Sequence, residues 1–120
     1  MRTSGVRTST SPAITLPASR IDFARINRAA LAVLPRLLER WLPSGWAEGA
    51  EYVALNPRRR DHRLGSFRVN MRTGRWADFA IAHARGGDVV SLVAYLSDIG
   101  QVEAAQRLTV MLGLEVRDAR

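Results

Sequence analysis

The 120-residue sequence contains no cysteine and no lysine, and it has no long apolar run. The absence of cysteine excludes disulfide bonds, thiolate nucleophiles and every zinc or iron–sulfur site that depends on cysteine ligands. A membrane-spanning helix needs about 18 or more consecutive apolar residues, and no such run occurs here. No apolar segment follows the first arginines, so the sequence predicts no secretory signal. We therefore expect a cytoplasmic protein that makes no contact with a membrane.

Arginine alone carries the positive charge, and most of that charge lies in one segment. The 18 arginines and 11 acidic residues give a net charge of +7. Positions 56–85 hold eight arginines and two acids, or +6, which leaves +1 for the other 90 residues. A GC-rich genome would explain the absence of lysine, and a solvated surface would explain some of the charge. The clustering nevertheless favours a polyanionic partner, because arginine pairs with phosphate and stacks on bases.

Composition and periodicity divide the chain into one domain and two tails. Residues 1–19 are rich in Ser, Thr, Arg and Pro without an apolar period, so we expect a flexible tail there and another at 116–120. The domain is expected at 20–115. It begins with a helix, because apolar residues recur at helical spacing from Ile21 to Leu42. Pro35 lacks an amide hydrogen, so it should kink this helix or open a second one.

The middle of the chain has the pattern of β-strands. Glu51–Asn56 is apolar enough to form a strand, and Ser66–Met71 alternates between apolar and polar residues. Arg72-Thr73-Gly74 has the composition of a turn, and Arg75–Phe79 follows it as the return strand. These segments predict a β-hairpin and one additional strand.

Two helices are expected after the hairpin. Asp88 is a suitable N-cap for the first helix, which ends at Asp98-Ile99-Gly100. The second helix runs from Gln101 to Leu112, and Gly113 ends it. The predicted fold class is α+β, with a small antiparallel sheet (a hairpin plus one strand) flanked by an N-terminal helix and two C-terminal helices.

The sequence from Asn56 to Leu114 resembles a known domain. Its motifs, in order, are Gly65-Ser66-Phe67, Trp76 with Phe79, Gly86-Gly87-Asp88, Ala104-Ala105 and Leu112-Gly113. Together they resemble the CHC2-type zinc-binding domain of DNA primases. The pattern is most similar to a cysteine-free branch associated with primase-helicase proteins of phages, plasmids and integrative elements. The resemblance implies a zinc-ribbon-like fold, contact with single-stranded DNA and a part in DNA replication.

The zinc ligands of this family are missing from the sequence. Counted from the shared motifs, the four ligand positions fall at Pro57, Arg60, Asp78 and Ile81. A structural zinc ion takes four nitrogen or sulfur ligands, and one carboxylate cannot replace them. His62 and His83 lack a second ligand pair, so we interpret both as loop residues. We expect no metal and no other cofactor.

An interaction of Asp78 is expected to take the place of the missing metal. A carboxylate among arginines can form an ion pair or hydrogen bonds. Such an interaction would join the segment that contains Pro57 and Arg60 to the segment that contains Asp78 and Ile81. The expected partner is Arg60 or Arg58.

An arginine-rich surface is the candidate binding site. Single-stranded nucleic acid is commonly bound by a basic groove with an aromatic platform. Of the two aromatic residues of the return strand, we expect Phe79 to pack in the core and Trp76 to stack on a base. The candidate nucleic-acid-binding residues are Arg58, Arg59, Arg60, Arg63, Arg68, Arg72, Arg75 and Trp76.

The Gly-Gly-Asp motif before the first of the two C-terminal helices has two interpretations. A helix N-terminus attracts anions, which would suit a phosphate-binding loop. However, Asp88 places a negative charge there and no Gly-Lys-Ser/Thr sequence occurs, so a structural helix cap is favoured.

The sequence predicts binding without catalysis. The carboxylates are scattered, and no nucleophile with its base has a local motif. The first hypothesis is a non-catalytic domain of a primase or replication system that binds single-stranded DNA. The alternative is a protein-interaction module that docks a helicase or primase partner.

Overall fold

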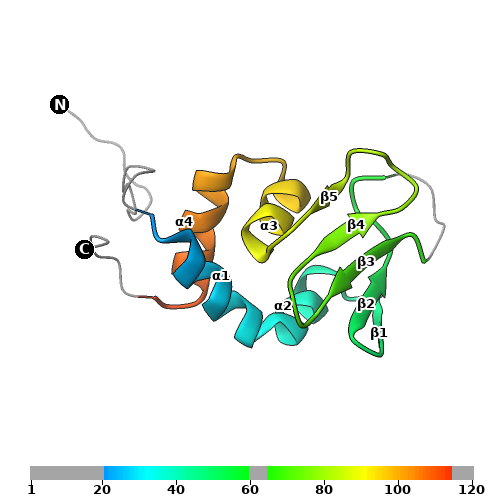
Figure 1. The fold of residues 1–120 in the computed structure, drawn as a ribbon, viewed down its shortest axis with the longest axis horizontal. Helices are drawn as coiled ribbons and strands as arrows, with labels where there is room; N and C mark the ends of the chain where they lie inside the picture. The colour runs from blue at the N-terminus through cyan, green and yellow to red at the C-terminus, as the bar shows by residue number, and fades with distance from the viewer. Residues whose placement is uncertain (1–20, 60–64, 115–120) are drawn as a thin grey trace.

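The computed structural model describes residues 21–59 and 65–114 (Figure 1). The tails expected at 1–19 and 116–120 lie outside the described residues, as do three side chains considered above: Arg60, His62 and Arg63. Within the described ranges the protein has four α-helices and a five-stranded sheet. The α+β class predicted from the sequence is confirmed.

The N-terminal helical segment forms two helices. α1 spans Phe23–Ala32, and the Asp22 carboxylate caps it by accepting a hydrogen bond from the Arg25 amide at 3.0 Å. The chain then bends, and α2 spans Leu34–Trp41. Pro35 lies in the first turn of α2, where an amide hydrogen would have no partner within the helix. The proline therefore opens a second helix.

The sheet is an antiparallel meander in which each strand pairs with its neighbours in the sequence. Its strands are β1 (Trp46–Glu48), β2 (Glu51–Ala54), β3 (Phe67–Asn70), β4 (Trp76–Asp78) and β5 (Arg85–Gly86). The strand and hairpin predicted from the sequence are β2, β3 and β4. The sequence does not predict the edge strands β1 and β5, because segments this short show no clear alternation.

The two C-terminal helices are α3 (Val89–Ser97) and α4 (Gln101–Met111). A capping box closes the start of α3: the Asp88 carboxylate accepts from the Ser91 amide at 2.9 Å, and the Ser91 side chain bonds to the Asp88 backbone. The first turn of α3 also bonds to α1, because the Asn27 side chain accepts a hydrogen bond from the Val90 amide at 2.9 Å. The amides of Val90 and Ser91 in the first turn of α3 are thus bonded within the protein.

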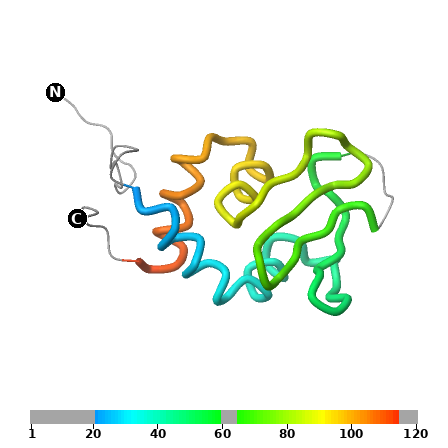
Figure 2. The backbone as a smooth tube through the Cα atoms, in the orientation of Figure 1, coloured from blue at the N-terminus to red at the C-terminus, as the bar shows by residue number. Residues whose placement is uncertain are grey.

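One face of the sheet packs against the helices and forms the core. Figure 2 shows the sheet at one end of the molecule and α1 and α4 at the other, with α3 between them. Tyr52, Phe67, Val69 and Trp76 lie on this inner face, are each at most 5% exposed, and belong to one apolar cluster with helix residues. The Tyr52 hydroxyl also donates a hydrogen bond to the Leu42 carbonyl at 2.8 Å, which ties the sheet to the end of α2.

The other face of the sheet, here called the outer face, points away from the helices (Figure 1). Val53 is buried on this face, and its neighbours in register are Trp46 on β1 and Arg68 on β3. Ala77 and Arg85 pair in register farther along the same face. Alternate residues of a strand point to opposite faces, so the charged residues of β3 and β5 lie here.

Candidate nucleic-acid interface

The two aromatic residues of the return strand occupy the opposite positions from those expected. Trp76 is 5% exposed, and its indole nitrogen donates a hydrogen bond to the Ser91 hydroxyl at 3.0 Å. Its ring also lies against that of Tyr95, with centroids 4.9 Å apart. Phe79 is 74% exposed. The expectation that Phe79 packs in the core while Trp76 stacks on a base is therefore wrong, because the alternation of β4 places Trp76 on the inner face.

An open groove of about 630 Å³ crosses the outer face of the sheet. We call it the sheet groove, and its charged and aromatic lining includes Glu51, Arg68, Arg75, Phe79 and Arg85. These residues come from β2, β3, β5 and the segments that adjoin β4. The sheet groove therefore combines guanidinium groups with an exposed aromatic ring.

Two of the groove arginines are available for a ligand. The side chains of Arg75 and Arg85 are exposed, and neither makes a hydrogen bond or ion pair with another residue in the described part of the chain. Arg72, in the turn between β3 and β4, is exposed in the same way. Arg85 is absent from the predicted site because β5 is too short to be recognised in the sequence.

Arg68 interacts with carboxylates of the sheet itself. Its Nη1 atom lies 3.0 Å from Oε1 of Glu51 and 3.5 Å from Oε1 of Glu48. Its Nε atom donates a hydrogen bond to the Gly65 carbonyl at 2.9 Å. The neighbouring carboxylates offset the charge of Arg68, so Arg75 and Arg85 carry most of the uncompensated charge of the groove.

Arg58 stabilises the C-terminal end of α3. Its guanidinium carbon lies 4.8 Å from the centre of the Tyr95 ring, and its Nη1 donates a hydrogen bond to the Tyr95 carbonyl at 3.1 Å. An ion pair with Asp98, 3.4 Å long, completes the contact. A cation is favourable at this position because the last carbonyls of a helix carry partial negative charge.

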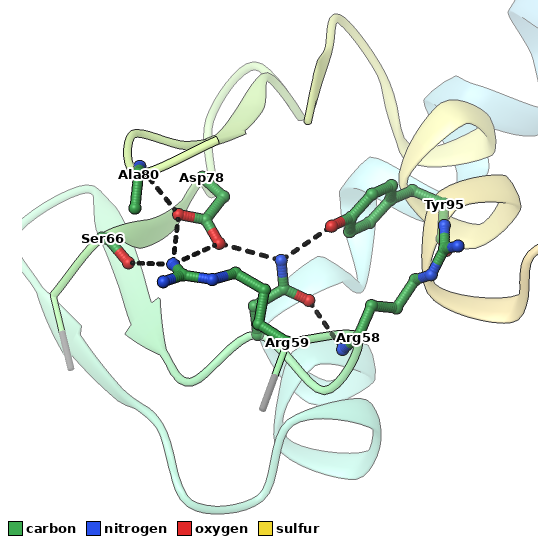
Figure 3. Close-up of polar contacts among 7 residues, drawn as sticks. Arg58, Arg59, Ser66, Asp78, Ala80 and Tyr95 are labelled. Carbon is green, nitrogen blue, oxygen red and sulfur yellow. Dashed lines mark hydrogen bonds and ion pairs between the residues drawn. The ribbon is translucent and has the colours of Figure 1, made fainter. Parts of the chain in front are cut away.

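Arg59 and Asp78 form the centre of a buried polar cluster (Figure 3). Nη1 of Arg59 lies 3.1 Å from both carboxylate oxygens of Asp78 and donates to the Ser66 hydroxyl at 3.3 Å. The side-chain amide of Asn56 donates to Asp78 at 2.9 Å and to the Tyr95 hydroxyl at 2.8 Å. The cluster therefore joins the segment after β2, the end of β4 and helix α3.

The environment of Asp78 favours its ionised form. Burial raises the pKa of this carboxyl, but hydrogen bonds from Asn56, the Ala80 amide, Arg59 and Ser66 lower it by more, so that the pKa lies below its usual value. The carboxylate is 0% exposed and relies on these donors in place of water.

The structure corrects the expected partner of Asp78. The residue that pairs with it is Arg59, whereas Arg58 reaches α3 instead. Arg60, the other expected partner, lies outside the described residues. No sequence pattern assigns a role to Asn56 or Tyr95. The one sequence feature that could point to Asn56 is its place in the Asn-Pro pair at the start of the primase-like segment.

The described residues contain neither a metal-ligand cluster nor a candidate membrane span. Within 21–59 and 65–114, no group of three or more His, Cys, Asp or Glu side chains is placed to hold a metal ion. In the same ranges, no helix is long and apolar enough to cross a membrane.

Comparison with solved structures finds a primase. One matching structure is that of the zinc-binding and RNA polymerase domains of the Aquifex aeolicus primase. The TM-score is 0.58 with 23% sequence identity, and the match covers 80% of this chain but 22% of the primase chain. No protein-family model matches this chain, and no curated protein matches it. The fold is therefore primase-like, whereas the cysteine-free branch and its link to mobile elements stay predictions.

Proposed function

We propose that this chain is a non-catalytic domain of a primase-type replication system and binds single-stranded DNA through the sheet groove. The observation that carries the proposal is the placement of exposed Phe79 in one groove with Arg75 and Arg85, whose guanidinium groups have no partner among the described residues. The primase-like fold supports a role in the same kind of system.

The groove supplies the two interactions that a single strand needs. A base stacked on an aromatic ring contributes about 1–3 kcal/mol, and it does so with little regard to sequence. Arginine pairs with phosphate through two parallel hydrogen bonds. In this proposal a base stacks on Phe79, and the phosphates on either side of it pair with Arg75 and Arg85.

The proposal changes the roles of several predicted binding residues. Arg58, Arg59 and Arg68 bind groups of the protein itself, so they act by shaping the domain. Trp76 also lines the groove but is only 5% exposed, so in this proposal it supports the site and does not stack on a base. Among the described arginines predicted from the sequence, Arg75 remains a direct DNA contact in the groove, whereas Arg72 is exposed in the adjoining turn and does not line it.

The Asp78 cluster takes the structural part that zinc takes in the family the sequence resembles. Asp78 occupies one of the four ligand positions, and Asn56 and Arg59 are each adjacent in sequence to another, at Pro57 and Arg60. The cluster connects the two segments that contain these positions. We propose that it fixes their spacing without a metal.

A salt titration tests the proposed function. A short fluorescein-labelled oligonucleotide is titrated with the full chain, and fluorescence anisotropy gives the association constant at several salt concentrations. If phosphate contacts drive binding, the logarithm of this constant falls linearly with the logarithm of salt concentration, by about 0.7 for each phosphate contacted. Single-stranded DNA should bind more tightly than a duplex of the same length, because the bases of a duplex cannot reach Phe79.

The titration also separates the proposal from the alternative of protein docking. A chain that only docks a helicase or primase would bind no oligonucleotide at low salt. Equal affinity for single strands and duplex would contradict base stacking, even if the salt dependence were steep.

A further inference from the structure

The outer face of the sheet carries two carboxylates that lie opposite each other. Glu48 of β1 and Glu51 of β2 are partners in the register of this antiparallel pair. Their side chains are 51% and 40% exposed. Like charges at directly opposite positions of a sheet repel each other and lower its stability. A cation placed beside both carboxylates would remove this repulsion.

Arg68 of β3 supplies that cation. Its Nη1 atom lies within 3.5 Å of a carboxylate oxygen of Glu48 and of Glu51, and its Nε atom is held by the Gly65 carbonyl. The second oxygen of Glu48 accepts a hydrogen bond from the Trp46 indole at 3.0 Å. We call Glu48, Glu51 and Arg68 the acidic triad, because two carboxylates and one guanidinium group give it a net charge of −1.

The two sides of the outer face therefore differ in charge. On the side of β4 and β5, Arg75 and Arg85 are exposed, and no acid pairs with them in the described part of the chain. On the side of β1 and β2, the acidic triad is negative. Glu51 and Arg68 line the sheet groove together with Arg75 and Arg85, so this difference lies within the groove itself. A phosphate is attracted to one end of the groove and repelled from the other.

We propose that Glu48 and Glu51 are specificity-determining residues of the sheet groove, which keep Arg68 from phosphate and confine the DNA to the side of β4 and β5. This inference rests on the proposed function. If Arg68 turned to a phosphate, the two facing carboxylates would lose their counter-ion and a third negative group would lie beside them. The small gain from one exposed ion pair would be offset by that repulsion. Arg68 is therefore a phosphate contact that the carboxylates withhold.

Neutralising both carboxylates tests this role. Glu48→Gln with Glu51→Gln removes two charges, and the glutamine at position 48 keeps an oxygen that can accept from the Trp46 indole. The full chain is titrated with a fluorescein-labelled single strand at several salt concentrations. We expect this double variant to bind about three- to tenfold more tightly than the parent protein at low salt. The log–log slope should become steeper by about 0.7, the equivalent of one added phosphate contact.

A second double variant, Glu39→Gln with Glu103→Gln, is the matched control. It removes the same charge from exposed positions on α2 and α4, and neither residue lines the sheet groove. Glu103 also pairs with an arginine, Arg107 at 3.1 Å, so the control likewise releases a guanidinium group. Because salt screens charges on distant surfaces, the affinity should stay within about twofold of the parent value. The slope should not change.

Replacing Arg68 shows whether the gain depends on its guanidinium group. Arg68→Met removes that group and keeps an unbranched apolar stem beside buried Val53, its partner in register. In the parent protein this change should leave the slope as it is, because Arg68 contacts no phosphate there. Combined with Glu48→Gln and Glu51→Gln, it should return the slope to the parent value. Such non-additivity would identify Arg68 as the added contact.

Three results would overturn this inference. An equal gain in the control variant would assign the effect to net charge. A shallower slope for Arg68→Met alone would mean that Arg68 already contacts phosphate. A gain that persists without Arg68 would mean that the carboxylates act by repulsion alone.

The same titrations separate this inference from the proposed function. A parent protein that binds no single-stranded DNA, or whose slope is independent of Arg75 and Arg85, would overturn the proposed function and this inference with it. Binding that depends on Arg75 and Arg85 but is unchanged by neutralising Glu48 and Glu51 would overturn this inference alone.

Discussion

Arg59 and Asp78 form an ion pair in which Nη1 lies 3.1 Å from Oδ2, and their side chains are 16% and 0% exposed. Removing one partner of a buried pair leaves an uncompensated charge, at a cost of about 3–5 kcal/mol. We expect Asp78→Ala and Arg59→Ala each to lower the free energy of unfolding by about that amount, measured by urea denaturation. An unchanged melting temperature for Asp78→Ala would contradict this role.

Two further variants sharpen the stability measurement. Asp98→Asn removes a carboxylate that also pairs with an arginine but is 81% exposed, so it should change stability by less than about 1 kcal/mol. The double variant of Arg59 and Asp78 to alanine should cost less than the sum of the single changes, since it leaves neither charge alone.

The lowered pKa of Asp78 predicts a specific loss of stability in acid. A carboxyl whose pKa is lower in the folded state contributes its full stabilisation above the unfolded pKa, which is about 3.9, and loses it as the pH falls through the folded pKa. The free energy of unfolding should therefore decrease as the pH is lowered below about 4. The Asp78→Asn variant should be less stable than the parent protein at neutral pH. Its free energy of unfolding should also change less as the pH is lowered. Urea denaturation at a series of pH values measures both effects.

Phe79 and Trp76 should give opposite results when each is replaced by alanine. Phe79 is 74% exposed, so its loss should leave the melting temperature unchanged and weaken single-strand binding by about 5- to 150-fold, the equivalent of one stacked base. Trp76 is buried, so its loss should cost about 3–5 kcal/mol of stability. Anisotropy titration and thermal denaturation of both variants test this prediction. A loss of stability for Phe79→Ala, with weaker DNA binding but unchanged stability for Trp76→Ala, would contradict it.

Arg75 and Arg85 should set the salt dependence of DNA binding. Replacing both by alanine should reduce the log–log slope by about 1.4, which is two phosphate contacts at about 0.7 each. Arg28→Ala with Arg36→Ala removes the same charge from exposed positions on α1 and α2, and this control should retain the slope of the parent protein. An equal reduction in the control would mean that net charge, and no particular groove, attracts the DNA.

Gly86 should tolerate no side chain, whereas Gly87 should accept one. A Cβ atom on Gly86 would lie 2.6 Å from Nε1 of Trp76 and would also clash with the Ser91 hydroxyl. A Cβ atom on Gly87 meets nothing within 4 Å. We expect Gly86→Ala to cost about 1–3 kcal/mol and Gly87→Ala to have little effect on urea denaturation. Equal stability of the two variants would argue against close packing of β5 on the Trp76 ring.

Strong local signals made much of the fold predictable from the sequence. The alternation of Ser66–Met71 and the glycine of the following turn identify the hairpin, and Pro35 marks the start of α2. The edge strands β1 and β5 have no comparable signal, because pairing with a neighbour defines them and their own composition does not. The predicted sheet therefore has the correct centre and lacks its two edges.

The binding site was harder to predict because it depends on which guanidinium reaches which carboxylate. Arg58 and Arg59 are adjacent in the sequence, yet one reaches Tyr95 of α3 and the other reaches Asp78 of β4. No local pattern distinguishes them. Phe79 was misplaced for a related reason, since the end of a three-residue strand cannot be located from alternation alone.

The Asp78 cluster has a consequence for how the protein matures in a cell. A zinc-dependent domain must acquire its metal after synthesis, and its thiolate ligands must escape oxidation. The side chains of Asn56, Arg59, Asp78 and Tyr95 need neither a metal supply nor a reducing environment to form their hydrogen bonds. Chelators and mild oxidants should therefore leave newly made chains able to fold, even under zinc starvation.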